Sequence, residues 1–490
     1  MMTGLLIVCS LIWVPVLLYQ IGQRGFLILI VWLFIAPVAS NVVNRPQANP
    51  FLRVSTVEDA GVDRKQQGEA YIRGETTIRL GELLEPNRLL FGAYLLVFGL
   101  HAFTLRRLPV PLDRTENWMA VFSLILVASA LLQSTRTAFS LRVATDAFIV
   151  PFLSYMVARR YVSTEDSLGK LIKVMGYLGF YVVLICFIER WIHPSITYRL
   201  SGPFPKRDAL YIVMMVVFFA ALVDWLISSS RDRKSVLPYG VQICLLASTP
   251  LIVLFTWTRG VWLGFLLGIW TFAFLGRNLV MWRRKLLILG LVLGLLPVAV
   301  VGFQQALGEE EVYSRVANIR NIYGRLATYR IMMNEMSSNP VFGIGLNNVR
   351  DLLAEEKESA YGMRSYSVSH NSYLSLGTEL GAIGIVAYLV VVGSIVGTGV
   401  RIHRMGKYPQ DRWRGIGVVA IMIAYLIPAA FDSTLYQTWV SHVYVFVYVG
   451  AIAGLYCQKP LEKPVIQSRQ SRESAVLTPS AVAREARNSL

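Results

Sequence analysis

The feature that most constrains the fold is a succession of long apolar runs. A helix needs about 20 mostly apolar residues to cross the hydrocarbon core of a bilayer, because each residue advances it by about 1.5 Å. Such runs follow one another along most of the 490-residue chain, which is 55% hydrophobic and only 16% charged. They predict an all-α polytopic membrane protein.

Thirteen runs are candidate spans, and we expect about 12–13 transmembrane helices with a large helical extracytoplasmic loop. Two of the runs are separated only by "TRG", so the count could change by one or two. The first run lacks a basic segment before it and a cleavage site after it, which favours a retained helix over a signal peptide. The runs lie at 3–19, 25–39, 89–105, 118–133, 143–158, 169–189, 209–227, 239–257, 260–275, 285–303, 373–399, 415–430 and 439–457.

Two long polar stretches and a polar tail divide the series of runs. The tail is rich in Ser, Arg and Glu and has no apolar periodicity, so we expect it to be disordered. The predicted organisation is two transmembrane helices (1–39), a polar extracytoplasmic insert (40–88), a transmembrane bundle (89–303), an extracytoplasmic loop (304–371), C-terminal transmembrane helices (372–457) and a cytoplasmic tail (458–490).

The distribution of Lys and Arg predicts the orientation, because short cytoplasmic loops retain these residues. When the loop "GRNLVMWRRK" (276–285) is placed inside, most of the basic short loops fall on the same side. Both long polar stretches then lie outside. The net charge of +17 is explained by this asymmetry. It does not indicate nucleic-acid binding, for which a basic face with interleaved aromatic residues is expected.

His370 lies directly before the apolar run that begins "YLSLGTELG", and the predicted orientation places it on the outer side. Asn371 and Ser372 are candidate caps of this helix, since their side chains accept hydrogen bonds from its first amides. His370 would then lie just outside the helix, where it faces the outer loop. A helix-capping or interfacial histidine is the structural alternative to a functional one.

Arg259, in "FTWTRGVWLG", lies at the outer junction of two runs with no real loop between them. An arginine at such a place is costly unless it faces the protein interior or a polar ligand. Gly260 permits a close backbone approach or an unusual turn. The alternative is an arginine that extends to the lipid head groups.

The outer loop contains "VYSRVANIRNIYGRLATYRIMMNEMSSNP", whose apolar spacing predicts a helix that ends at Asn339–Pro340. One interpretation is an amphipathic helix on the membrane surface with its basic residues at the head groups. Arg325 follows Gly324, and we expect it near the N-terminus of the most regular stretch, where anions bind. Arginines occur in this segment at positions 315, 320, 325 and 330.

The stretch "NPVFGIGLNNV" (339–349) follows this helix and predicts a glycine-rich turn. Gly343 and Gly345 are expected to let the backbone approach a ligand. A pair of glycines is a weak signal when taken alone.

Three motifs occur in a fixed order around the large outer loop: "TRGVWLG", "GRLATYR…NPVFGIGLNN" and "HNSYLSLGTELGAIG". In this order the chain resembles the O-antigen ligase and polysaccharide polymerase superfamily of bacterial envelope enzymes. The stretch "YRLSGPFPKRDALYIVM" (198–214) is also similar to the family, and the resemblance covers roughly residues 195–400. The first 190 residues agree only in being membrane helices, and the insert 40–88 is not a feature of the family.

The resemblance implies a bacterial inner-membrane glycosyltransferase that works without a metal ion or other cofactor. It would move a glycan from a polyprenyl (undecaprenyl) diphosphate carrier to an acceptor hydroxyl on the periplasmic face. The implied partners are this donor, a glycan or lipid-anchored saccharide acceptor and membrane lipids, with no nucleic acid. O-antigen ligase and O-antigen or exopolysaccharide polymerase both remain open, because they share the donor chemistry and differ in the acceptor.

The resemblance also implies site residues. His370 is carried over as the catalytic histidine, and Arg259 and Arg325 as the two arginines that bind the donor diphosphate. Arg330 competes with Arg325 for the second place. The "TRG" of this chain stands where the family often has Ser before Arg.

Three further residues on the outer side have open roles. Asn371 and Glu379 are candidate substrate-binding residues, although Glu379 is equally well explained by structural pairing. Asp432, in "AAFDSTLYQ", is expected either to bind a sugar hydroxyl or to cap a helix.

A transporter or flippase of lipid-linked saccharides is the competing class. Such proteins often show internal repeats and broken helices around a charged site at the midplane. No convincing repeat relates the two halves of this chain, and its informative polar residues gather at the outer face. A scaffolding membrane protein would not need Arg259 at a junction of spans. Chemistry at the membrane surface is therefore favoured.

Overall fold

The computed structural model describes residues 24–31, 113–192, 200–204, 207–229, 235–276, 319–355, 369–436 and 439–457. Over these ranges it is helical and contains no strand, and six helices are long and apolar enough to cross a membrane. The predicted all-α polytopic membrane fold is confirmed. The predicted spans 3–19, 89–105 and 285–303, most of 25–39, the insert 40–88 and the tail 458–490 lie outside the described residues.

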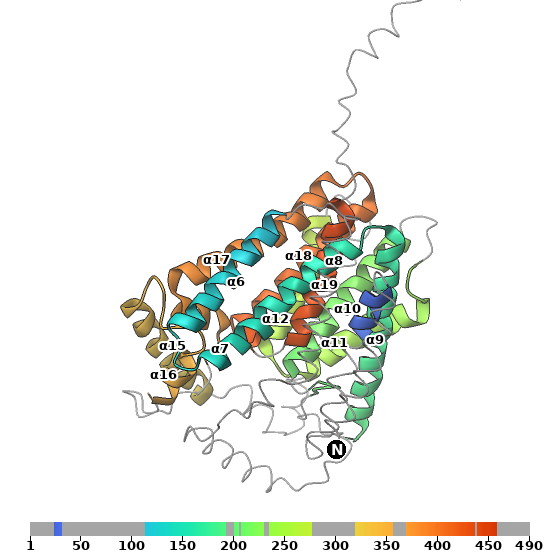
Figure 1. Ribbon diagram of the computed structural model, residues 1–490. Coiled ribbons are helices and arrows are strands. Elements are labelled where there is room, and N and C mark those ends of the chain that lie inside the picture. The colour runs from blue at the N-terminus through green and yellow to red at the C-terminus, as the bar shows by residue number, and fades with distance from the viewer. Residues whose placement is uncertain are drawn as a thin grey trace, which may run out of the picture. The chain divides into compact units, whose positions relative to one another are not determined.

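Every predicted run from 118–133 to 260–275, and every run from 373–399 to 439–457, corresponds to an observed helix (Figure 1). Two further helices, α15 (Ile319–Ser338) and α16 (Val349–Glu355), lie in the predicted outer loop. The helices of the bundle are α6 (Arg114–Leu132), α7 (Thr137–Ala144) continued by a π-helical turn and α8 (Val150–Tyr161), α9 (Glu165–Ile192), α10 (Arg207–Ser228), α11 (Tyr239–Phe255), α12 (Arg259–Leu275), α17 (Ser372–Met405), α18 (Pro409–Ala429) and α19 (Trp439–Cys457).

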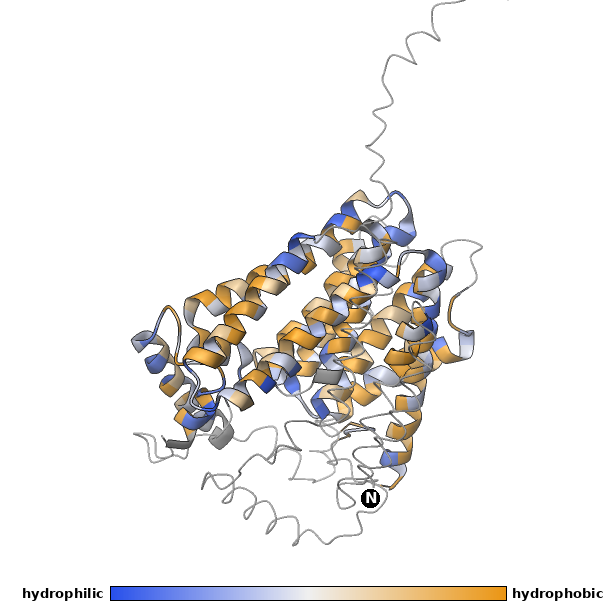
Figure 2. Cartoon of the chain, in the orientation of Figure 1, coloured by the Kyte–Doolittle hydropathy of each residue, from blue (hydrophilic) through white to orange (hydrophobic). Residues whose placement is uncertain are grey.

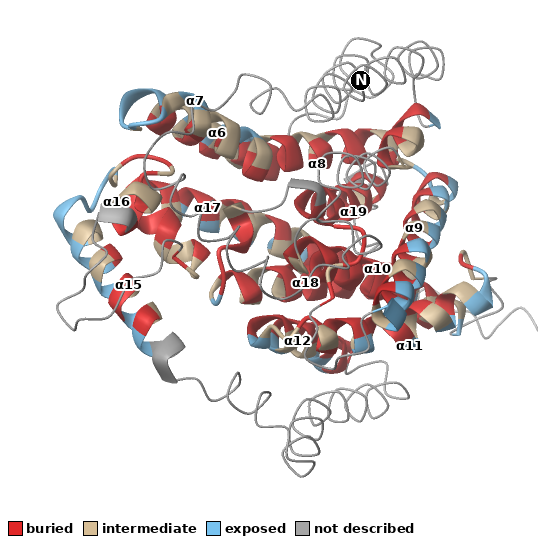
Figure 3. Cartoon of the chain, turned by 90° about the horizontal axis from the view of Figure 1, so that it is seen from below, coloured by how far each residue is buried: buried red, intermediate tan, exposed pale blue. Residues whose placement is uncertain are grey.

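Helices α10 and α18 form the interior of the described bundle. Of the apolar window of α10, 94% is buried, against 44% for α9 and α17. Figure 3 shows α10 and α18 mostly in red, while α9 and α15 present pale blue faces. Hydrophobic residues cover the bodies of the helices, and hydrophilic residues gather at their ends and on α15 and α16 (Figure 2). This pattern is the one expected when lipid surrounds the bundle.

Helix α12 packs closely on α18 through glycines four residues apart. A Cβ atom added to Gly264 would lie 2.9 Å from the carbonyl oxygen of Ala424, and one added to Gly268 would lie 3.2 Å from that of Ala420. Small residues at this spacing let helix backbones approach in a membrane, where van der Waals packing rather than the hydrophobic effect holds helices together. The "TRGVWLG" motif therefore has a packing role in addition to its arginine.

Helix α17 is broken at Gly381, whose φ of 63° and ψ of −163° are not helical. The turn 340–345 pairs with the backbone on both sides of the break. The amides of Ile344 and Gly345 donate to the carbonyls of Thr378 (3.0 Å) and Glu379 (2.9 Å), and the amide of Ala382 donates to Pro340 (2.8 Å). The backbone groups that the break would leave open are thus partly satisfied from the outer loop.

Two predictions about the outer loop are wrong. Gly343 and Gly345 bring their backbone against protein rather than ligand: a Cβ on Gly343 would meet the carbonyl of Glu379, and one on Gly345 that of Gln133. Arg325 does not lie at a helix N-terminus, because α15 begins at Ile319 and places it in the second turn. The helix continues through Gly324, since one buried glycine costs only about 1 kcal/mol in a helix.

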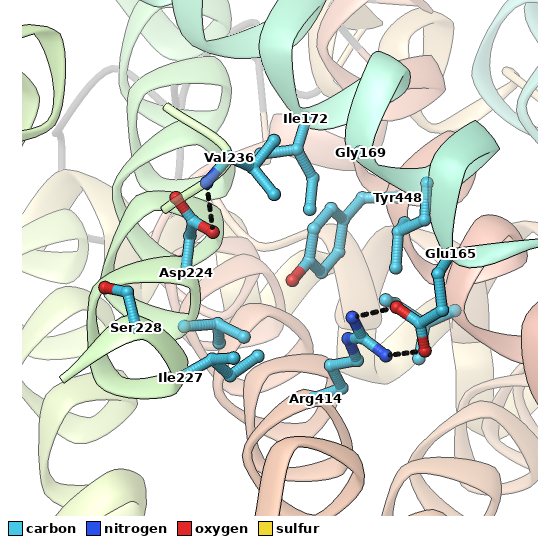
Figure 4. A pocket seen from close by; sticks show the side chains of 12 residues that line it. Glu165, Gly169, Ile172, Asp224, Ile227, Ser228, Val236, Arg414 and Tyr448 are labelled. Atoms are coloured by element: carbon cyan, nitrogen blue, oxygen red, sulfur yellow. Dashed lines mark hydrogen bonds and ion pairs between the residues drawn. The ribbon is translucent and has the colours of Figure 1, made fainter. Parts of the chain in front are cut away.

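The bundle has two distinct ends. At the first, called the His370 end below, α10, α12 and α17 begin. At the opposite end Glu165 and Arg414 form a two-bond ion pair of 2.8 and 2.6 Å. This pair lines a pocket together with Asp224 and Tyr448 (Figure 4). The carboxylate of Asp224 accepts from the amides of Val236 and Leu237 (both 3.1 Å) and thereby fastens the end of α10 to the start of α11.

Replacing Gly264 by Val should weaken the α12–α18 contact, because the added methyl groups have no room against Ala424 and Pro428. Overpacking of this kind costs about 1–3 kcal/mol. Thermal unfolding of the purified protein in detergent measures the effect. The control is Gly393→Val in α17, where an added Cβ meets nothing within 4 Å. Equal unfolding temperatures for the two variants would contradict the close packing.

Candidate functional site

The site is built around the turn 430–436 between α18 and α19. The Ser372 hydroxyl, in the first turn of α17, donates to the carbonyl of Asp432 (2.9 Å) and accepts from the amide of Leu435 (3.2 Å). The start of α17 is thereby fixed to this turn. Asn371 is the N-cap of α17, with its side-chain oxygen accepting from the amides of Tyr373 (3.1 Å) and Leu374 (3.0 Å), as the sequence predicts.

His370, just before α17, faces Asp432 of this turn. His370 Nδ1 lies 3.3 Å from Asp432 Oδ1, at the long end of the hydrogen-bond range. Burial alone would raise the pKa of Asp432, but the hydrogen bond and charge of His370, the Ser433 amide and the charge of Arg207 outweigh it. The pKa of Asp432 is therefore lower than usual, and the carboxylate is ionised at neutral pH. The ionised Asp432 carboxylate favours the His370 tautomer in which Nδ1 carries the proton and Nε2 has the lone pair.

The backbone of His370 is strained. Its φ of 49° lies in the left-handed region, which costs a non-glycine residue about 1–3 kcal/mol. Tyr329 of α15 donates its hydroxyl to the His370 carbonyl at 3.1 Å. Burial raises the pKa of Tyr329, partly offset by the charge of Arg325, so the hydroxyl keeps its proton. The residue is held in place from both sides, by Tyr329 and by the Asn371 cap.

Arg325 contacts the same turn from α15, and Arg259 lies next to a glycine of α12 that packs on it. Arg325 Nη1 donates to the carbonyl of Phe431 at 3.2 Å. Gly260 packs on the same residue, since an added Cβ would lie 2.8 Å from Phe431 Cβ. Arg259 is the first residue of α12 and directly precedes Gly260. Residues from α12, α15 and α17 therefore converge on Phe431 and Asp432.

Helix N-termini add to the positive potential at this end. Helices α12 and α17 begin beside the turn, and the charge of Arg207, the first residue of α10, acts on Asp432. The N-terminal end of a helix carries a partial positive charge and unpaired amides, which favour anions. Trp257, two residues before Arg259, has a φ of 53°, a rare conformation for a bulky residue. The arrangement suits a ligand with a concentrated negative charge.

The other predicted site residues are Arg330, Glu379 and Asn371. Arg330 is exposed and lies about 140° round α15 from Arg325, given about 100° per residue. Glu379 is buried, with its carboxyl beside the amides of Asn347 and Val349 and the hydroxyl of Tyr436. Glu379 therefore lies where the outer loop packs on α17. The side-chain oxygen of Asn371 is occupied by the helix cap.

Sequence reasoning did not single out Tyr329 or Arg207, and it did not connect Asp432 with His370. The two members of that pair are 62 positions apart. A signal for Tyr329 existed, because it follows Arg325 by four residues and so lies on the adjacent part of the α15 surface. Arg207 lies in the stretch 198–214 that is similar to the family, but nothing in that stretch singles it out.

Residues 243–389 match the family model described as O-antigen ligase. The matched region contains Arg259, Arg325 and His370, and the resemblance inferred from the three motifs is confirmed over it. The stretch 198–214 and Asp432 lie outside the match. No curated protein matches the chain. The match supports an O-antigen ligase or polymerase type of activity for this multi-pass membrane protein.

Proposed function

We propose that the protein transfers a glycan from a polyprenyl diphosphate carrier, undecaprenyl diphosphate in bacteria, to an acceptor hydroxyl. The reaction takes place on the periplasmic face of the inner membrane, and the His370 end is that face. The acceptor is a lipid-anchored saccharide in an O-antigen ligase or a growing glycan in an O-antigen or exopolysaccharide polymerase. The observation that carries the proposal is that Arg325 and His370 contact the turn at Phe431 and Asp432, while Arg259 directly precedes Gly260, which packs on Phe431. All three residues lie inside the region that matches the family.

The donor diphosphate binds at the positive end of the site. Arg259 and Arg325 supply planar guanidinium groups, which match phosphate oxygens in pairs and stay charged at all relevant pH values. The N-termini of α12 and α17 lie beside them and add the positive ends of their helix dipoles. These groups are in place before reaction, so they stabilise the charge that develops on the diphosphate as it leaves.

His370 acts on the acceptor. Its Nε2 removes the proton of the acceptor hydroxyl while the oxygen attacks the anomeric carbon of the donor sugar. The bond between that carbon and the diphosphate oxygen breaks, and its electron pair leaves with the polyprenyl diphosphate. Ionised Asp432 at Nδ1 holds the ring and stabilises the imidazolium that forms. The proton then passes to solvent or to the released diphosphate.

The broken helix α17 is a feature that also occurs in transporters and flippases. In those proteins, broken helices line a cavity near the midplane. Here the break at Gly381 is occupied by the backbone of the turn 340–345, and the titratable groups of the site gather at the end of the bundle. These features favour transfer over transport.

Arg259→Ala and Arg325→Ala should each lose most glycan transfer while the protein still inserts and folds. Losing a charged contact to the diphosphate should cost about 2–5 kcal/mol, or roughly 30- to 4000-fold in rate or affinity. Lysine at either position keeps the charge but cannot donate two parallel hydrogen bonds to a phosphate, so it should restore activity only in part. Transfer from a purified lipid-linked donor measures the effect.

The matched control for Arg325 is Arg330→Ala, on the same helix but a different face. It should keep most of its activity. Full activity of the Arg259→Ala protein, or an equal loss in the Arg330→Ala protein, would contradict the diphosphate assignment.

His370→Ala should reduce transfer by about 10²–10⁴-fold, the usual effect of a positioned acid or base. Asp432 stays ionised near neutral pH because its pKa is lowered, so protonation of this carboxylate should not limit activity there. His370→Gln can hydrogen-bond the acceptor but cannot take its proton. A Gln variant with native activity would rule out the base.

Tyr329→Phe removes only the hydroxyl that holds the His370 carbonyl. Since a typical hydrogen bond contributes about 0.5–1.5 kcal/mol, we expect kcat to fall roughly 2- to 10-fold with little change in the KM for the donor. The control is Tyr323→Phe, an exposed tyrosine of the same helix. A raised KM with unchanged kcat would instead give Tyr329 a role in donor binding.

A further inference from the structure

We propose that the turn between α15 and α16 inserts two side chains, Val341 and Phe342, among the lipid acyl chains at the edge of the bilayer core. The sequence places this turn within a polar loop. The partner is the acyl-chain region of the leaflet at the His370 end. The proposal does not depend on the reaction or on which compartment this end faces.

Both side chains are unusually exposed for their type. Val341 is 48% exposed and Phe342 is 63% exposed, in a turn whose neighbours Gly345 and Leu346 are buried. Single exposed apolar residues are common on soluble surfaces. The location of these two, rather than their exposure alone, identifies their surroundings.

The positions of the charged residues in α17 indicate how deep the turn lies in the membrane. Between Glu379 and Arg401 the helix carries no charged residue. The stretch from 382 to 400 has a length of about 28 Å at about 1.5 Å per residue, close to the ~30 Å of a hydrocarbon core. Arg401 then lies at one boundary of the core and Ile383 at the other. The break at Gly381 lies at this second boundary.

Backbone hydrogen bonds tie the turn to this level. The amide of Ala382 donates to the carbonyl of Pro340 at 2.8 Å, and the amide of Ile383 donates to that of Val341 at 3.3 Å. Val341 therefore lies at the depth of Ile383, at the edge of the hydrocarbon core. The preceding residues Ser337, Ser338 and Asn339 are exposed and polar and suit the head-group region.

The exposed side of α17 continues into the turn. Ile383, Val386 and Leu389 follow at steps of three and are 40%, 56% and 52% exposed. An apolar row of this kind on a membrane-spanning helix faces lipid. Because Val341 is hydrogen-bonded to the first residue of the row, Val341 and Phe342 extend the lipid-facing surface beyond the helix. This continuity favours acyl chains over a protein partner.

The insertion anchors α15 at its C-terminal end. This helix lies against α17 (Figure 1), where Thr378 donates its hydroxyl to the carbonyl of Met332 at 3.3 Å. Its first half reaches the turn at Phe431 through Arg325. Insertion of Phe342 would therefore set the height of α15 above the bilayer core.

Collisional relaxation of nitroxide labels tests the proposal directly. In a background with Cys9, Cys186, Cys244 and Cys457 replaced, Phe342→Cys is labelled and the full-length protein is placed in phospholipid nanodiscs. Oxygen concentrates in acyl chains, whereas a water-soluble nickel chelate stays outside. Val386→Cys is the lipid reference and Ser337→Cys the aqueous reference. Val341→Cys replaces Phe342→Cys if the latter does not yield folded protein.

We expect the label at position 342 to be relaxed by oxygen more than by nickel, as at position 386 and opposite to position 337. Relaxation mainly by nickel would overturn the proposal, because the turn would then lie in water. Protection from both reagents would overturn it too, because the two side chains would then be covered by protein.

Discussion

The backbone hydrogen bonds between the turn 340–345 and the broken helix α17 are the interactions on which the rest of the described structure depends. A transmembrane helix that loses its hydrogen-bond ladder must have its backbone groups satisfied by other protein. In this chain the turn 340–345 supplies donors to Thr378 and Glu379 and an acceptor to Ala382. The outer loop is therefore attached to the bundle by backbone bonds, which fix its register. Arg325 and Tyr329 are carried to His370 by this attachment.

A second set of hydrogen bonds holds the outer loop to the end of α6. The side chain of Asn348 donates to the carbonyl of Gln133 (3.2 Å) and accepts from the amide of Thr135 (3.2 Å). The Leu346 amide donates to the hydroxyl of Ser129 at 3.0 Å. The loop is thus held between α17 and the end of α6. Titratable groups also meet at the opposite end of the bundle, at Glu165 and Arg414 (Figure 4), but there they pair with one another.

Features that depend on composition and local spacing could be predicted from the sequence. The apolar runs, the end of α15 at Asn339 and the Asn371 cap all follow from neighbouring residues. The pairing of Asp432 with His370 could not be predicted, because it joins positions brought together only by the packing of α17 against α18. The glycines of "NPVFGIG" were expected to face a ligand, since a sequence cannot show whether the backbone that needs the space belongs to a ligand or to the protein itself.

The proposed reaction requires a diphosphate between Arg259 and Arg325 with His370 beside it. The most direct measurement is a cryo-electron microscopy structure of the protein in nanodiscs with a bound polyprenyl diphosphate saccharide. We expect diphosphate density in contact with both guanidinium groups and the first sugar next to His370. Density at the Glu165–Arg414 end, or at the His370 end without contact to either arginine, would contradict it.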